Sequence, residues 1–124
     1  MQSIEIPDSV TGIGDRAFQN CSSLGTVKLS KGLEELYGSA FAYCEELTEI
    51  EIPKSLKKAD YSGLYSDDGI GPFYECKGLK NVTFEKGTTR VAQWLFAGCT
   101  GLEEIVIPDT VISIDRGAFY KCSN

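Results

Sequence analysis

Histidine is absent from the 124-residue chain, and this absence removes several kinds of catalytic site. Without an imidazole, neither a Ser–His nor a Cys–His dyad can form. The sequence also has no glycine-rich phosphate loop of the GxxxxGK[ST] type. Neighbouring acids such as Glu103 and Glu104 could serve acid–base chemistry, but adjacent acids on a loop or strand usually face water. The sequence therefore predicts that the chain is not an enzyme and needs no cofactor.

Long apolar runs and an excess of positive charge are also missing. No stretch of about 18 apolar residues occurs, so we expect no membrane insertion by this chain. Its first residues, 1–5, have neither the basic segment nor the apolar stretch of a signal peptide. The 12 Lys and Arg residues against 18 Asp and Glu give a net charge of −6. A phosphate-binding face needs clustered cations, so we expect no nucleic acid partner.

What the sequence does contain is a repeat. Five cysteines follow one another at spacings of 23, 32, 23 and 23 residues, and a phenylalanine stands three residues before each. A leucine follows three residues after each of the first four cysteines, and a pair of apolar residues separated by one residue comes next. The Phe/Cys pairs are Phe18/Cys21, Phe41/Cys44, Phe73/Cys76, Phe96/Cys99 and Phe119/Cys122, and the apolar pairs are Ile4/Ile6, Val27/Leu29, Ile50/Ile52, Val82/Phe84 and Ile105/Ile107.

This repeat predicts a solenoid. Segments 47–52 and 102–107 alternate apolar and polar residues, which indicates short half-buried strands. The A-F-x-x-C stretch is too short for an independent helix, so we expect a single helical or 3-10 turn that directs its Phe and Cys inward. One repeat cannot form a core alone, whereas stacked repeats share a continuous one. We therefore expect a parallel β-sheet on the concave face, one internal column of phenylalanines and another of cysteines.

The predicted domain is single and spans residues 1–124, in five stacked turns. Starting each repeat at the leucine position gives 1–23, 24–46, 47–78, 79–101 and 102–124, the third of which carries a nine-residue insertion. Neither end shows a capping repeat, although an isolated solenoid normally needs polar caps. We therefore expect a piece of a longer array, with end-to-end self-association through the strand edges that its ends expose.

With these blocks the chain resembles the BspA-like, or treponemal-type, leucine-rich repeats. The segments LTEIEIP at 47–53 and IPDSVTGIGDRAFQNC at 6–21 carry the resemblance, which covers the chain apart from the insertion. The departures are at Pro72, Thr88, Ser30 and Glu85. The resemblance implies an α/β leucine-rich-repeat solenoid. It also implies a bacterial or protist protein, at the cell surface or secreted, that serves adhesion or protein recognition and has no family catalytic residues.

The cysteines are the first candidates for chemistry. Their number is odd, which disfavours a fully paired disulfide framework. Zinc needs four ligands converging on one point, whereas stacked strands about 4.8 Å apart would set the sulfurs along a line. We therefore interpret the cysteines as buried packing residues with a weak S–H donor, and we predict no metal site.

The predicted concave face is one candidate binding surface. Its outward positions lie between the paired apolar residues and just before them, and solenoids commonly bind partners on such a face. A mostly acidic strip interrupted by one lysine would suit a basic or mixed-charge partner, although polar outward positions also serve solubility. The candidate binding residues are Glu5, Thr26, Lys28, Glu49, Glu51, Asn81, Thr83 and Glu104.

The insertion in the third repeat is the other candidate. Insertions in repeats map to loops on one face and are often functional, and tyrosines are enriched at interfaces. The candidate residues are Tyr61, Tyr65, Asp67 and Asp68. Its aspartates lack the EF-hand spacing of a calcium site, and an insertion without function is an equal alternative.

The sequence favours one function and leaves a second open. The first is a non-catalytic recognition or adhesion module that binds a protein, such as a host matrix or surface protein, through the concave face and the inserted loop. The alternative is a structural spacer in a longer surface protein, with no ligand of its own.

Overall fold

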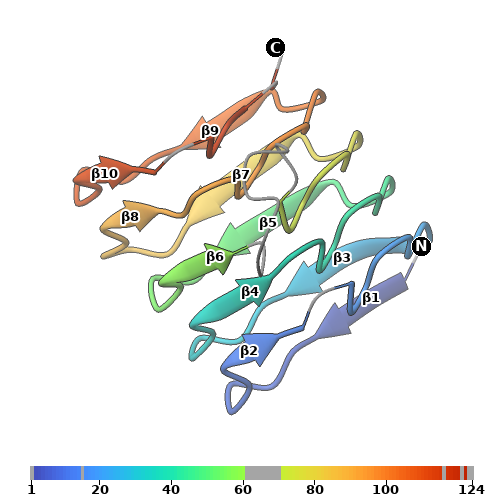
Figure 1. Ribbon diagram of the computed structural model, residues 1–124, viewed down its shortest axis with the longest axis horizontal. Helices are drawn as coiled ribbons and strands as arrows, with labels where there is room; N and C mark the ends of the chain where they lie inside the picture. The colour runs from blue at the N-terminus through green and yellow to red at the C-terminus, as the bar shows by residue number, and fades with distance from the viewer. Residues whose placement is uncertain (1, 15, 61–70, 116, 121, 123–124) are drawn as a thin grey trace.

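The chain coils into a solenoid with two layers of short parallel strands, seen in a computed structural model (Figure 1). The structure describes residues 2–14, 16–60, 71–115, 117–120 and 122. Strands of the first layer alternate along the chain with strands of the second, so each repeat passes through both layers in turn. The apolar side chains of successive repeats fill the space between the layers.

The first layer is a five-stranded parallel sheet in the order β1-β3-β5-β7-β9, which confirms the predicted parallel pairing. In β5, Ile50 and Ile52 are buried while Glu49 and Glu51 are exposed, as period-two alternation requires. Each strand pairs with its equivalent in the next repeat, so like residues stack on like residues. The strands are β1 (Gln2–Glu5), β3 (Leu24–Lys28), β5 (Glu49–Ile52), β7 (Asn81–Phe84) and β9 (Glu104–Val106).

The second layer contains shorter strands and is divided in two. One sheet has the order β2-β4-β6, and β8 pairs with β10 in the other. The division falls between β6 and β8, and the inserted residues follow β6 directly. These strands are β2 (Gly12–Ile13), β4 (Glu35–Tyr37), β6 (Lys58–Asp60), β8 (Arg90–Val91) and β10 (Ser113–Ile114).

The two predicted internal columns are confirmed. The five phenylalanine rings stack in sequence, with centroid separations of 5.0, 5.3, 5.6 and 5.8 Å. The first ring pair, Phe18 and Phe41, is parallel to within 4°. Beside the rings, each thiol from Cys44 onward donates to the carbonyl of a phenylalanine in the preceding coil, at Sγ···O distances of 3.1 to 3.2 Å. Rings and thiols thus connect neighbouring coils along the core.

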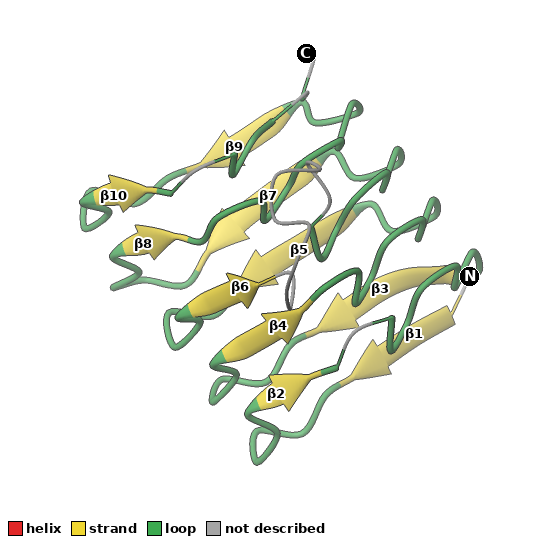
Figure 2. Ribbon diagram, viewed as in Figure 1, coloured by secondary structure: helices red, strands yellow, loops and turns green. Residues whose placement is uncertain are grey.

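The helical or 3-10 turns expected of the A-F-x-x-C stretches are not found, because the described residues form only strands, turns and loops (Figure 2). The backbone N–H of Phe41 donates across to Pro72 O at 2.7 Å, rather than along its own segment. Two residues after each of the first four phenylalanines of the column, the backbone also enters the left-handed region, as at Tyr43 (φ 63°) and Glu75 (φ 57°). A right-handed helix cannot continue through such a residue. In the described part of the chain, no helix of the length and apolarity needed to cross a membrane is found.

The number of turns also differs from the expected five. The chain returns to the first sheet four times, from β1 to β3, β5, β7 and β9. Five paired strands are joined by four complete coils, so the solenoid has about four turns. Each turn places one strand of the first sheet on the preceding one and thereby builds a continuous outer face.

Candidate functional site

The outward face of β3, β5 and β7 is hollowed into a shallow groove, which we call the sheet groove. Its volume is about 290 Å³. Parallel pairing fixes its floor, with Thr26 opposite Glu49 and Glu49 opposite Asn81. Adjacent strands lie about 4.8 Å apart, so these three side chains form a row across the groove. The groove is lined by Thr26, Val27, Lys28, Leu29, Lys31, Glu49, Ile50, Glu51, Pro53, Asn81, Thr83 and Glu85.

Six of the eight sheet residues predicted as binding residues line this groove, and all eight are exposed. The other two, Glu5 and Glu104, lie on the outer strands β1 and β9. Glu5 stands opposite Lys28 and Glu104 stands opposite Asn81 in the register of the sheet. The two glutamates therefore flank the groove on the same face without lining it.

The charges of the sheet groove are mixed. Glu49, Glu51 and Glu85 contribute three carboxylates, and Lys28 and Lys31 contribute two cations. The positive charge lies on the β3 side of the groove, and the negative charge lies on β5 and just after β7. A segment carrying both signs of charge could meet opposite charges across this groove.

Two charged residues of the groove, Lys31 and Glu85, were missed by the sequence analysis as candidate binding residues. Both lie just after a first-sheet strand, where the chain turns toward the second layer. Glu85 occupies the position of the strand-ending proline, and its carboxylate accepts a hydrogen bond from the Lys54 backbone N–H at 2.9 Å. The sequence shows that glutamate replaces proline at this position, but it does not show that the Glu85 side chain lines the groove.

The inserted-loop candidates, Tyr61, Tyr65, Asp67 and Asp68, lie outside the described residues. Their place in the chain is nevertheless clear from the residues on either side. β6 ends at Asp60, and at Pro72 the backbone carbonyl already accepts from Phe41 of the preceding coil. The insertion is therefore preceded in the chain by a second-layer strand and followed by the A-F-x-x-C side of the coil.

The cysteines lie in the core, apart from the sheet groove. All five are free thiols, and the three inner thiols (Cys44, Cys76 and Cys99) are fully buried. Burial raises the pKa of Cys44 to about 11 and also raises the pKa of the other two inner thiols, because it disfavours the thiolate. Among the described residues, no group of three or more Cys, Asp or Glu side chains could hold a metal ion. The inner thiols act as packing and hydrogen-bonding groups.

The repeat pattern and the coil together identify the family. A family model described as the BspA type leucine rich repeat region matches residues 1–70 and 69–124, in six copies. The chain belongs to the BspA-type leucine-rich-repeat family. Its departures from the pattern, including Thr88 and Glu85, lie in turns whose backbone hydrogen bonds to the neighbouring coil or within the turn are kept, such as Glu85 N to Ile52 O at 2.8 Å. No curated protein matches the chain.

Two solved structures resemble this BspA-type chain. One is the leucine rich repeat protein of T. pallidum, with 28% identity and a TM-score of 0.53, where the match covers 90% of this chain and 59% of that one. The other is a leucine rich cell surface protein of Faecalibacterium prausnitzii, with 32% identity and a TM-score of 0.60, covering 97% of this chain and 30% of that one. The chain therefore spans less than two thirds of either protein.

Proposed function

We propose that this domain is a non-catalytic recognition module that binds a protein through the sheet groove, with the inserted loop as a second contact. The observation that carries the proposal is the groove itself, which spans three strands of a sheet whose backbone is held by parallel pairing on both sides. A preorganised surface loses little conformational entropy on binding. The family's repeats supply this surface, and the side chains at its outward positions supply the specificity.

The charges of the groove favour a partner segment that carries both signs. Glu49 and Glu51 would pair with basic side chains of the partner, while Lys28 would pair with an acidic one. Complementary charges of this kind increase association rates and select between partners more than they increase affinity. The exposed hydroxyls of Thr26 and Thr83 add hydrogen-bonding groups along the same face.

We further propose that the domain works at the cell surface or outside the cell, in adhesion. The support is the F. prausnitzii structure, which is described as a leucine rich cell surface protein and shares 32% identity with this chain. A protein exposed there would meet matrix and surface proteins of a host, which are the partners to test first.

The test is binding of the domain to immobilised fibronectin, fibrinogen and collagen, measured by biolayer interferometry. We compare the wild type with Glu49→Lys/Glu51→Lys, which reverses the charge on β5. The matched control is Glu45→Lys/Glu46→Lys, which makes the same change of charge at two exposed positions in the turn that precedes β5. A third variant, Tyr61→Ala/Tyr65→Ala, tests the loop.

We expect the Glu49/Glu51 variant to weaken binding by about 10-fold or more, since two charge-assisted contacts would become repulsive. The control should change the affinity by less than about 2-fold. If binding occurs and neither the groove variant nor the loop variant alters it, both surfaces are wrong. Absence of binding to every protein in a wider panel would favour the spacer alternative instead.

A further inference from the structure

A second groove lies at the edge of the solenoid, where the chain leaves the first sheet for the second layer. It is lined by residues 54–57, 89–90 and 112–113, and we call it the corner groove. These three segments belong to three successive coils, and the groove has a volume of about 330 Å³. The corner groove shares no lining residue with the sheet groove.

The corner groove concentrates positive charge in an acidic protein. Lys54, Lys57 and Arg90 line it, and none of its described lining residues is an aspartate or glutamate. The whole chain, by contrast, carries a net charge of −6. Three cationic side chains that line one concave surface favour the approach of anions.

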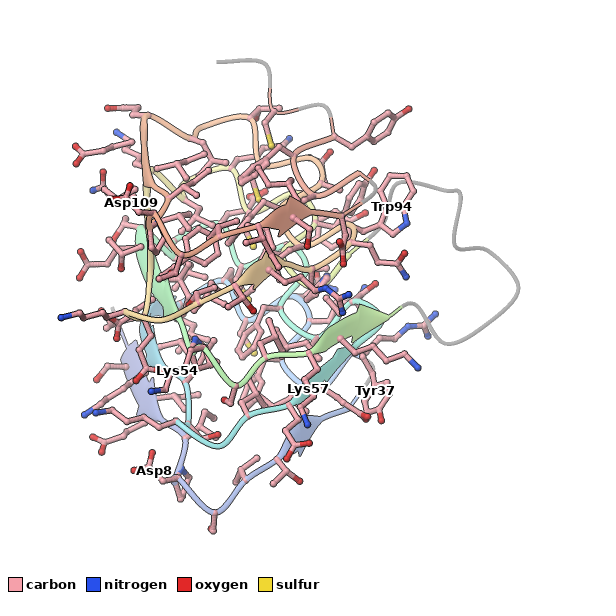
Figure 3. All side chains as sticks on the ribbon, turned by 90° about the vertical axis from the view of Figure 1, so that its left-hand side faces the viewer. Asp8, Tyr37, Lys54, Lys57, Trp94 and Asp109 are labelled. Atoms are coloured by element: carbon pink, nitrogen blue, oxygen red, sulfur yellow. The ribbon has the colours of Figure 1, made fainter. Side chains whose placement is uncertain are left out.

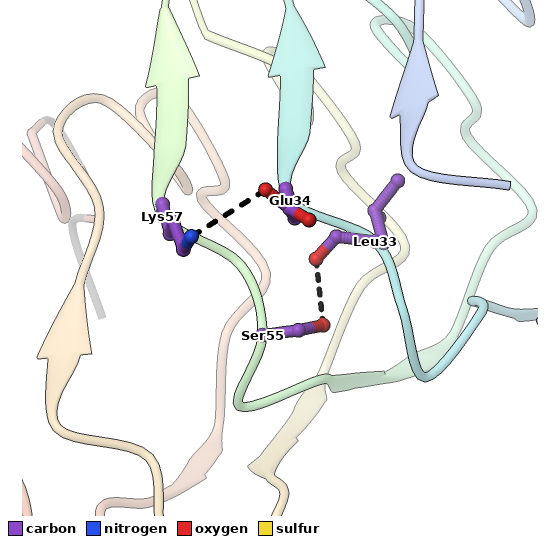
Figure 4. A network of polar contacts seen from close by, with 4 residues as sticks. All are labelled: Leu33, Glu34, Ser55 and Lys57. Carbon is purple, nitrogen blue, oxygen red and sulfur yellow. Dashed lines mark hydrogen bonds and ion pairs between the residues drawn. The ribbon is translucent and has the colours of Figure 1, made fainter.

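The ion pairs of these cations are weak enough to leave them available. Lys57 Nζ lies 3.5 Å from a Glu34 carboxylate oxygen, and both side chains are largely exposed, at 74% and 48% (Figure 4). Exposed pairs of this kind contribute little stability. Arg90 pairs with Asp115 through its Nε at 3.3 Å, and the described residues show no other hydrogen bond or ion pair of this guanidinium. Glu34 and Asp115 are not lining residues, so they flank the groove without filling it.

The aliphatic stem of Lys54 lies close to the neighbouring coil. A Cβ at Gly87, in the next coil, would lie 3.5 Å from Lys54 Cδ, so the stem runs over this glycine. At the equivalent position in the outer coils stand Asp8 and Asp109, with Lys54 between them along the stack (Figure 3). Two coil spacings of about 4.8 Å separate Lys54 from each aspartate, so each aspartate lies about 10 Å from Lys54 along the axis.

Apolar and hydroxyl groups complete the groove. Ile112 is 87% exposed and forms an apolar wall. Ser55 donates its hydroxyl hydrogen to Leu33 O at 2.7 Å, which orients its oxygen lone pairs as acceptors (Figure 4). Thr89 and Ser113 add two further hydroxyls. A ligand that suits this lining carries anionic groups and hydroxyls and also has an apolar C–H face.

A sugar ring that bears anionic groups has all three features. We propose that the corner groove binds a short segment of an anionic polysaccharide, with Lys54, Lys57 and Arg90 contacting sulfate or carboxylate groups and Ile112 packing against the ring. An inorganic anion would leave Ile112 without a contact. A nucleic acid would extend its phosphates toward Asp8 and Asp109, which would repel them.

The experiment measures the affinity of the full chain for dextran sulfate, polygalacturonate, unmodified dextran and a DNA oligonucleotide, by calorimetry at near-physiological salt. Dextran sulfate and dextran share one backbone and differ in charge, so together they isolate the anionic groups. The test variant is Lys54→Gln/Arg90→Gln. The matched control is Lys77→Gln/Lys80→Gln, which removes the same charge from two lysines that are 59% and 56% exposed and lie outside the groove.

We expect binding to dextran sulfate, to polygalacturonate or to both, none to dextran, and weaker binding to DNA. The test variant should weaken binding at least 10-fold, and the control should weaken it less than 2-fold. Thr89→Asp, which adds a carboxylate inside the groove and leaves every ion pair intact, should also weaken it. The proposal is overturned by equal losses in both charge variants, by tighter binding to DNA, or by no binding to either polyanion. Matching circular dichroism spectra and melting temperatures check that the variants are folded.

Discussion

The phenylalanine column allows the stability of the solenoid to be tested position by position. Phe41 is fully buried and stacks on both sides, with ring centroids at 5.0 and 5.3 Å and interplanar angles of 4° and 5°. Replacing a buried phenylalanine by alanine costs about 3–5 kcal/mol, and each aromatic pair adds about 0.5–1.5 kcal/mol beyond the area it buries. Because Phe41 is fully buried and its replacement removes two stacking contacts, we expect a loss at the upper end of the first range. Phe41→Ala should lower the free energy of unfolding by about 4–5 kcal/mol.

The matched comparison is Phe18→Ala, at the start of the column. Phe18 is only partly buried, and it stacks on one ring in the described residues. We therefore expect a loss of about 2–3 kcal/mol for this variant. A surface control, Tyr43→Ala, removes an aromatic ring that is 39% exposed and should cost about 1 kcal/mol.

Urea unfolding followed by circular dichroism gives the three free energies by linear extrapolation. Equal losses for Phe18→Ala and Phe41→Ala would refute the reasoning, because the number of stacking partners and the degree of burial would then not determine stability. The comparison requires that the free energy of unfolding falls with urea concentration at the same slope in the wild type and in all three variants. A changed slope would indicate that a different part of the solenoid unfolds cooperatively.

Two other predictions concern the thiols and the close contacts between coils. Burial raises the pKa of Cys44 from an ordinary value of 9.0 to about 11, so an unfolded thiol ionises at lower pH than the folded one; stability is therefore fully present below pH 9 and should fall as the pH rises toward 11. Urea midpoints measured at pH 8 and at pH 10 give this fall in stability. The fall should be smaller in Cys44→Ala than in the wild type, and an equal fall in the two proteins would contradict the prediction. A Cβ at Gly101 would lie 2.2 Å from Lys77 O in the preceding coil, whereas one at Gly14 would meet nothing within 4 Å. We expect Gly101→Ala to cost about 1–3 kcal/mol and Gly14→Ala to be neutral or stabilising; the same melting temperature for both would contradict this contact.

The sequence predicted the features that repeat in residue type. Identical residues at constant spacing, such as Phe41 and Phe73, must meet when coils stack, so the columns and the first sheet followed directly. The left-handed residues that prevent a helix did not follow, because the equivalent positions hold Asn20, Tyr43 and Glu75, which share no conformational preference. The second layer was missed because a strand as short as β4 shows only one fully buried residue, Leu36.

The two grooves differ in how far the sequence could predict them. The outward positions of the sheet groove alternate with buried residues, so period two was sufficient to find residues such as Glu49 and Thr83. The corner groove joins Lys54, Arg90 and Ile112, which come from three turns whose side-chain directions depend on the bend of each coil. The repeat boundaries and the expected end-to-end self-association stay predictions.

The hydrogen bonds between coils have a mechanical consequence. They connect neighbouring repeats along the first sheet, within each of the two parts of the second layer, and along the A-F-x-x-C side, where Tyr43 N donates to Tyr74 O at 2.8 Å. Hydrogen bonds between parallel strands run roughly along the stacking direction, so a pull on the two ends loads them along their own direction and opens them one coil at a time. A released 23-residue repeat extends to about 75 Å. Under tension the solenoid would therefore lengthen in steps, with a longer step for the 32-residue third repeat, rather than fail at once.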